Sequence, residues 1–236
     1  MAIGVLLASV ASYLVVAIAL QSAGLTMLLV VVGGELALLL LPLYAIKRLD
    51  LRRSALGLRW PPAMPMIGAV LIGSTAWYLN MRLVALLPFD EGRLRQLSEV
   101  VDAPPLVLAL FALALIPAIC EEVLFRGAVQ RAIATRLFAP AAIVLSSLIF
   151  SAYHMSPIQL VPTFTLGLAL GALAWRADSI APAMLAHFLN NTMAVLVSRR
   201  QPPALAGWFE VHPNAALAGC AIATVAGLVL IARTPT

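Results

Sequence analysis

Long apolar runs dominate the sequence and constrain its fold more than any other feature. A helix rises about 1.5 Å per residue, so each crossing of a membrane core about 30 Å thick needs roughly 20 apolar residues. About eight runs approach this length, and they cover residues 3–20, 25–46, 65–87, 104–120 and beyond, 140–154, 158–175, 180–197 and 215–231. These runs predict an all-α fold, a polytopic transmembrane helical bundle of about eight spans.

The composition of the chain agrees with this class. Hydrophobic residues make up 63 % of the 236 residues and charged residues 11 %, whereas soluble chains average roughly 45–50 % and 25 %. The connections between runs are mostly short, so we expect a single transmembrane domain over residues 1–236. The first run lacks the basic segment that opens a secretory signal, and we interpret it as the first span. Cys120 and Cys220 lie in apolar runs and imply no disulfide framework.

The charged residues predict the orientation in the membrane. The net charge is +5, and the connection after the second run is strongly basic, with Lys47, Arg48, Arg52, Arg53 and Arg59 against Asp50. The next connection is acidic, with Asp90, Glu91, Glu99 and Asp102 against Arg93 and Arg95. The basic connection and both termini should therefore be cytoplasmic, although Arg199 and Arg200 oppose this assignment. Basic residues beside spans indicate topology, so we expect no nucleic-acid partner.

Two further expectations concern the surroundings of the chain. The segment from Phe89 to Val101 mixes apolar and charged residues, which fits a short interfacial helix about as well as a polar loop. The sequence is rich in Ala and Arg and has Lys47 as its sole lysine, which is typical of a GC-rich bacterium. We therefore expect the protein in a bacterial inner membrane, in contact with the lipid bilayer. The sequence does not indicate an oligomeric state.

Few strongly polar side chains lie inside the predicted spans. Charged groups at membrane depth are costly and usually line a cavity or pair with one another, so each is a functional-site hypothesis. The groups in question are Glu35, Glu121, Glu122, Arg126, His154, His187, Asn190 and Asn191. Glu35 follows Gly33 and Gly34, which allow close helix approach, and we interpret it as a structural hydrogen-bond partner. Gly167 and Gly171 form a G-x-x-x-G pattern that is typical of helix packing.

The spacing of the charged residues separates the two neighbouring glutamates. On a helix, Glu122 and Arg126 are i, i+4 neighbours about 40° apart, whereas Glu121 and Arg126 are about 140° apart. Arg126 should therefore neutralise Glu122 and leave Glu121 free.

Helix lengths predict that the remaining groups lie at similar levels. A turn near Phe138 places Glu121 and His154 each about 25 Å along their helices. The next turn, near Asp178, places His187 and Asn191 about 14–20 Å along the helix that follows it. The two residues share one face of that helix. A single intramembrane cavity that holds Glu121, His154, His187 and Asn191 is therefore feasible.

These residues resemble the motifs of the CPBP family, intramembrane proteases that include type II CAAX prenyl endopeptidases and Abi-like, bacteriocin-processing relatives. The family pattern is E-E-x-x-x-R, then F-x-x-x-H, then H-x-x-x-N or D on successive helices. The chain supplies Glu121 to Arg126, Phe150 to His154 and His187 to Asn191, in order and with the same spacing. Residues 104–197 would form the catalytic core, and the first three spans match no motif.

The resemblance implies a hydrolase that cuts a membrane-associated peptide or protein, with prenylated CAAX-like substrates as one option. It implies that Glu121 is the general base, that His154 holds the attacking water, and that His187 and Asn191 donate to the oxyanion. Glu122 and Arg126 would support the site. The family has also been regarded as metal-dependent, in which case Glu121, His154 and His187 would bind zinc. We favour a glutamate-activated water and expect no cofactor, because the chain has no His-Glu-x-x-His helix.

Two other classes of function stay open at this stage. A non-enzymatic bacteriocin immunity or membrane scaffold protein could use the same fold to bind a partner peptide. A proton-coupled transporter also needs intramembrane Glu, His and Arg, but transporters usually show paired repeats with broken helices. We find no such pairing between the two halves of the sequence.

Overall fold

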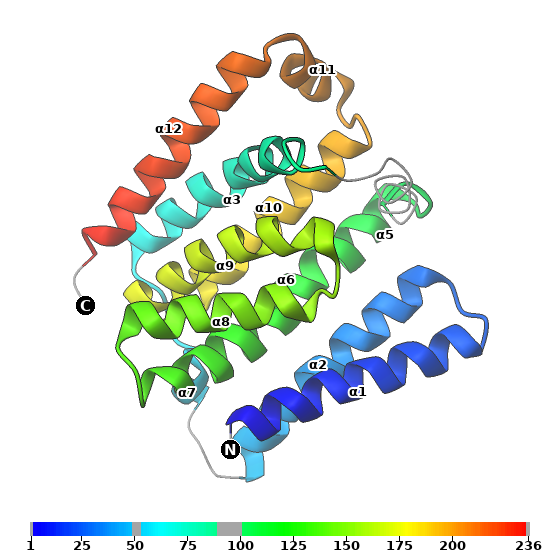
Figure 1. Ribbon diagram of the computed structural model, residues 1–236, viewed down its shortest axis with the longest axis vertical. Helices are drawn as coiled ribbons and strands as arrows, with labels where there is room; N and C mark the ends of the chain where they lie inside the picture. The colour runs from blue at the N-terminus through cyan, green and yellow to red at the C-terminus, as the bar shows by residue number, and fades with distance from the viewer. Residues whose placement is uncertain (1, 49–52, 89–100, 235–236) are drawn as a thin grey trace.

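The computed structural model describes residues 2–48, 53–88 and 101–234, and within these ranges it contains helices and no β-strand (Figure 1). The longer helices are α1 (Ala2–Ser22), α2 (Met27–Arg48), α3 (Ala63–Val84), α8 (Ala139–Tyr153), α9 (Pro157–Ala177), α10 (Ala181–Ser198) and α12 (Pro213–Ala232). One further helix, Leu106–Ala134, is continuous but irregular, with the segments α5 (Leu106–Leu110), η2 (Phe111–Leu115), α6 (Ile116–Glu122), η3 (Val123–Gln130) and α7 (Arg131–Ala134). The predicted polytopic helical bundle is confirmed.

All eight predicted runs form helices, but these helices differ in length and hydropathy. Six of the helices in the described ranges are long and apolar enough to cross a membrane by length and composition. The other two are α8, with 15 residues, and α10, with 18 residues. Helix α10 carries His187 and the two asparagines, which lower its hydropathy, and it packs against α3, α9 and α6. Burial among other helices explains how a polar span is accommodated.

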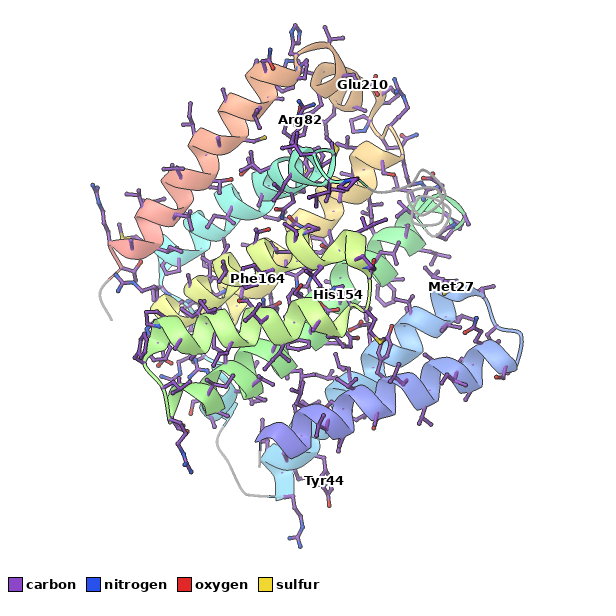
Figure 2. The ribbon with its side chains drawn as sticks, viewed as in Figure 1. Met27, Tyr44, Arg82, His154, Phe164 and Glu210 are labelled. Carbon is purple, nitrogen blue, oxygen red and sulfur yellow. The ribbon has the colours of Figure 1, made fainter. Side chains whose placement is uncertain are left out.

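The helices form three groups in space (Figure 1). Helices α1 and α2 make a hairpin along one side, and α3 packs with α12 along the other. Between them lie α6, η3, α8, α9 and α10. Figure 2 shows His154 near the middle of the molecule, whereas Tyr44 and Glu210 lie at its periphery. The candidate polar groups are therefore enclosed by helices from both halves of the chain.

The long central helix contains two π-helical segments, which the sequence analysis did not predict. In η2 the peptide N–H of Ile116 donates to the carbonyl of Phe111, a five-residue step. The second segment, η3, begins at Val123, directly after the two glutamates. π-Helical turns are rare and frequent at functional sites. Glu121 and Glu122 thus lie in a short α-helical stretch between two widened turns.

Small residues and backbone carbonyls bring α9 close to this central helix. The carbonyls of Gly167 and Gly171 accept hydrogen bonds from Arg126 Nη2, at 3.3 Å, and from Gln130 Nε2, at 3.0 Å. A Cβ atom at Gly167 would lie 3.0 Å from the Cβ of Ser147 in α8. The predicted packing role of this G-x-x-x-G pattern is confirmed.

Helix α1 begins, and helices α2 and α12 end, at the same end of the bundle (Figure 1). Lys47 and Arg48 lie in the last turn of α2. Asp178 pairs with Arg59 and, at 2.9 Å, with Arg131. Asp178 also ends α9 with a left-handed backbone, as the predicted turn requires. The orientation of this end toward the cytoplasm stays a prediction.

Arg199 and Arg200, the exceptions to the charge rule, are held by neighbouring groups. Arg199 donates to the carbonyls of Asp102 and Pro104, and Arg200 pairs with Glu210 of α11 (Pro203–Val211), a helix that we did not predict. These contacts explain how both charges are accommodated at the opposite end. The predicted interfacial segment, 89–101, lies outside the described residues except for Val101.

Candidate active site

The centre of the site is the pair of glutamates at the end of α6. Glu121 is 4 % exposed and Glu122 is fully buried. Arg126 Nη1 donates to Glu122 Oε1 at 2.9 Å, and both side chains have no exposed surface. The predicted pairing of Glu122 with Arg126 is confirmed. Glu121 forms no such contact with the guanidinium, so its carboxyl is left to other partners.

Arg126 is held from several sides, which fixes the position of Glu122. The guanidinium carbon lies 4.3 Å from the centre of the Phe150 ring. Its Nη2 donates to the carbonyl of Gly167. A guanidinium over an aromatic face is stabilised electrostatically, more so when it is desolvated. Phe150, the aromatic residue of the second motif, therefore helps to keep the buried charge in place.

His187 joins the two glutamates, a contact that sequence spacing did not indicate. Its Nδ1 lies 2.9 Å from Glu122 Oε1, and its Nε2 lies 3.7 Å from Glu121 Oε2. Because Glu122 Oε1 also accepts the hydrogen bond from Arg126, the short contact is best satisfied by an N–H on Nδ1 that donates to the same oxygen. The ring is thereby oriented with Nε2 toward Glu121. Glu122 accordingly has a second role as the residue that orients His187.

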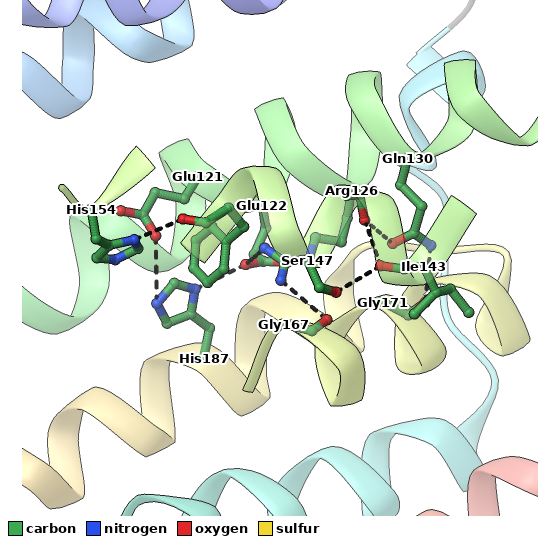
Figure 3. A network of polar contacts seen from close by, with 12 residues as sticks. Glu121, Glu122, Arg126, Gln130, Ile143, Ser147, His154, Gly167, Gly171 and His187 are labelled. Atoms are coloured by element: carbon green, nitrogen blue, oxygen red, sulfur yellow. Dashed lines mark hydrogen bonds and ion pairs between the residues drawn. The ribbon is translucent and has the colours of Figure 1, made fainter. Parts of the chain in front are cut away.

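His154 lies at the end of α8, where the helix stops. The following residue, Met155, has a positive φ of 47°. The Nδ1 atom of His154 lies 2.9 Å from the carbonyl oxygen of Phe150. Since a carbonyl oxygen only accepts hydrogen bonds, Nδ1 carries the proton and Nε2 of the neutral ring has a free lone pair. Figure 3 shows His154, Glu121 and His187 at one end of the polar network, as the matching helix levels predicted.

Asn191 also contacts the helix that carries the glutamates. Its Nδ2 donates to the carbonyl of Leu113 at 3.0 Å, and its Oδ1 accepts from Asn190 at 3.1 Å. The predicted shared face of His187 and Asn191 is confirmed, because both side chains point at the central helix. One of the two Nδ2 hydrogens is thus committed to structure and one remains for another acceptor.

Glu35 of α2 lies beside this site, which sequence reasoning did not anticipate. Its side chain is 3 % exposed, and the hydroxyl of Tyr153 donates to its Oε1 over a long 3.4 Å. A charged residue in the middle of an apolar run was the available signal.

The alternative zinc site finds no support in the placement of its three candidate ligands. Within residues 2–48, 53–88 and 101–234, no three His, Cys, Asp or Glu side chains are arranged to hold a metal ion. The Nδ1 atoms of His154 and His187 contact a carbonyl and a carboxylate, and Nε2 of His187 lies 3.7 Å from Glu121 Oε2. We therefore assign no step of the chemistry to a metal.

The central part of the chain is similar to a known protein family. Residues 103–193 match the family model described as type II CAAX prenyl endopeptidase Rce1-like. No curated protein and no solved structure matches the chain. The matched segment extends from the start of the central helix into α10 and includes all three motifs, so the resemblance to the CPBP family is confirmed for this part.

Proposed function

Because residues 103–193 match the model of the type II CAAX prenyl endopeptidase Rce1-like family, we propose that the protein hydrolyses a peptide bond of a membrane-associated peptide or protein. The observation that carries this proposal is the buried carboxyl of Glu121, which lies beside two histidines and is left free because Arg126 occupies Glu122. Peptide hydrolysis needs a base for water and donors for the oxyanion. The site contains side chains for both tasks.

The attacking water would be held between Glu121 and His154. The free lone pair on Nε2 of His154 accepts one hydrogen of the water, and Glu121 accepts the other as the oxygen adds to the peptide carbonyl. The proton on Glu121 then passes to the leaving nitrogen when the C–N bond breaks. Burial keeps bulk water away from these steps and strengthens the electrostatic interactions inside the site.

His187 and Asn191 would stabilise the oxyanion. Asn191 has one Nδ2 hydrogen beyond the one that it donates to Leu113. His187 donates from Nε2 only as an imidazolium, because its Nδ1 faces Glu122. The contact of Nδ1 with Glu122 holds the ring in this orientation. Glu122 would therefore support catalysis through His187 as well as through the helix.

A cavity near the end of α8 is the candidate approach for the substrate. A cavity of about 300 Å³ is lined by Ser151, Ala152, Met155, Ser156, Pro157 and Leu160. These residues surround the end of α8 and the start of α9, so the cavity adjoins the turn that presents His154. We propose that the peptide approaches along this mostly apolar surface, which suits a membrane-associated chain.

The decisive experiment offers peptides to the purified protein in detergent. Prenylated CAAX-like peptides and matched unmodified peptides are incubated with wild-type protein and with Glu121→Gln, and mass spectrometry identifies the products. We expect new termini with wild type and none with the variant. Wild-type protein that is folded yet cleaves no peptide, or a variant that cleaves as well as wild type, would contradict the proposal and favour a non-enzymatic immunity or scaffold function.

A further inference from the structure

Asn190 is a polar residue of the site that the mechanism above does not use. It precedes Asn191 in α10, and its side chain is buried, at 9 % exposed. Its Nδ2 donates to the side-chain oxygen Oδ1 of Asn191 at 3.1 Å. Side chains one position apart on a helix leave the axis about 100° apart and do not face each other. The two amides therefore lean together, which adjacency in the sequence does not by itself bring about.

This hydrogen bond holds the Asn191 amide at its oxygen, while a second bond holds it at its nitrogen. One Nδ2 hydrogen of Asn191 goes to the carbonyl of Leu113 at 3.0 Å. The last side-chain torsion of asparagine is broad, so one hydrogen bond alone leaves the amide plane free to turn about it. Because resonance keeps an amide planar, fixing its oxygen and one hydrogen also fixes the direction of the other hydrogen. That second Nδ2 hydrogen is the one assigned to the oxyanion.

The other polar atom of Asn190 shows that this side chain is not the most stable choice for its position. Its Oδ1 is buried, and the groups within residues 2–48, 53–88 and 101–234 offer it no hydrogen-bond donor. An unpaired buried carbonyl lowers the stability of a fold. An apolar side chain at position 190 would avoid this cost, but it could not donate to Asn191. The hydrogen bond to Asn191 is therefore what the asparagine at this position supplies.

We propose that Asn190 is a positioning residue that aims the second Nδ2 hydrogen of Asn191 at the oxyanion. It acts through Asn191, because its own Nδ2 is turned to that residue and its side chain is buried. A donor that is oriented in advance stabilises the charge of the transition state without a cost of reorganisation. Loss of this orientation should lower kcat and leave KM nearly unchanged. The inference rests on the proposed peptidase function and on the oxyanion role of Asn191.

The test compares two variants of α10 on a peptide that wild-type protein cleaves. Asn190→Leu removes the donor together with the unpaired oxygen. It should lower kcat about tenfold, the effect of one hydrogen bond, with KM within about twofold and no fall in melting temperature. Thr192→Val is the matched control, because it removes another buried oxygen without a partner on the far side of Asn191, and it should leave kcat within about twofold. Wild-type kcat in Asn190→Leu, or an equal loss in Thr192→Val, would overturn the proposal.

A double variant tests whether Asn190 acts through Asn191. Asn191→Ala already removes the oxyanion donor, so the addition of Asn190→Leu should lower kcat no further. Losses that multiply in the double variant would reveal an independent effect and overturn the positioning role. If Asn190→Leu does not fold, Asn190→Ala removes the same donor without added bulk and takes its place in both comparisons. Wild-type protein that cleaves no peptide contradicts the peptidase function itself, whereas cleavage that is unchanged by loss of Asn190 contradicts the positioning role alone.

Discussion

The side-chain amide of Asn191 donates to the backbone carbonyl of Leu113 at 3.0 Å. In a regular α-helix this carbonyl would accept from residue 117, which is Pro117 and has no N–H. Asn191 therefore replaces a missing backbone donor in the helix that carries Glu121. The residue that was predicted to stabilise an oxyanion thus also ties α10 to the irregular part of the central helix.

This double role predicts separable effects on stability and on rate. Asn191→Ala should lower kcat by roughly a hundredfold or more, as expected for an oxyanion donor, and lower stability by about 1 kcal/mol. The double variant Asn191→Ala with Pro117→Ala regains an N–H for Leu113 and should recover the melting temperature but not the rate. Recovery of both quantities would show that Asn191 acts only through the helix.

The two neighbouring glutamates should respond differently to the same change. Glu121→Gln removes the base and should abolish turnover while the protein stays folded. Glu122→Gln should destabilise the protein by about 3–5 kcal/mol, because it leaves the buried charge of Arg126 without its partner, and it also weakens the hold on His187. Melting temperature and peptidase rate, measured on both variants in one detergent, test this. Equal losses of stability would contradict the division of roles.

Metal removal should leave the activity unchanged. We propose a mechanism in which Glu121 activates the water and no metal takes part. Dialysis against 1,10-phenanthroline should change the peptidase rate by less than about twofold, and elemental analysis should find far less than one zinc per chain. A rate that falls on dialysis and returns with added zinc would establish the metalloprotease alternative.

The charge distribution predicts cytoplasmic termini. Arg59 and Arg131 pair with Asp178, and Arg176 donates to the carbonyl of Ile231 near the end of α12. Helix α1 begins and α12 ends at the same end of the bundle (Figure 1). A reporter that is active only outside the cytoplasm should be inactive when fused after Thr236 and active when inserted in the connection after α3. The reverse pattern would place the basic end outside.

Much of the architecture could be read from the amino-acid sequence. Apolar length predicted every long helix, because a hydrocarbon core demands about 20 apolar residues per crossing. The i, i+4 spacing predicted the pair of Glu122 and Arg126, since helix periodicity is local. Equal distances from the turn near Phe138 correctly predicted that Glu121 and His154 lie at one level.

Tertiary structure decided the contacts between residues on different helices, which the periodicity of a single helix does not predict. The bond from His187 to Glu122 depends on how α10 crosses α6, and the approach of Glu35 depends on the hairpin of α1 and α2. The π-helical turns on either side of α6 also shift side-chain directions away from a regular helix. Sequence alone therefore determined which polar groups lie within the spans, because the apolar runs around them are long enough to cross a membrane. Packing determined which of them meet, because hydrogen bonds of about 3 Å require a three-dimensional fit.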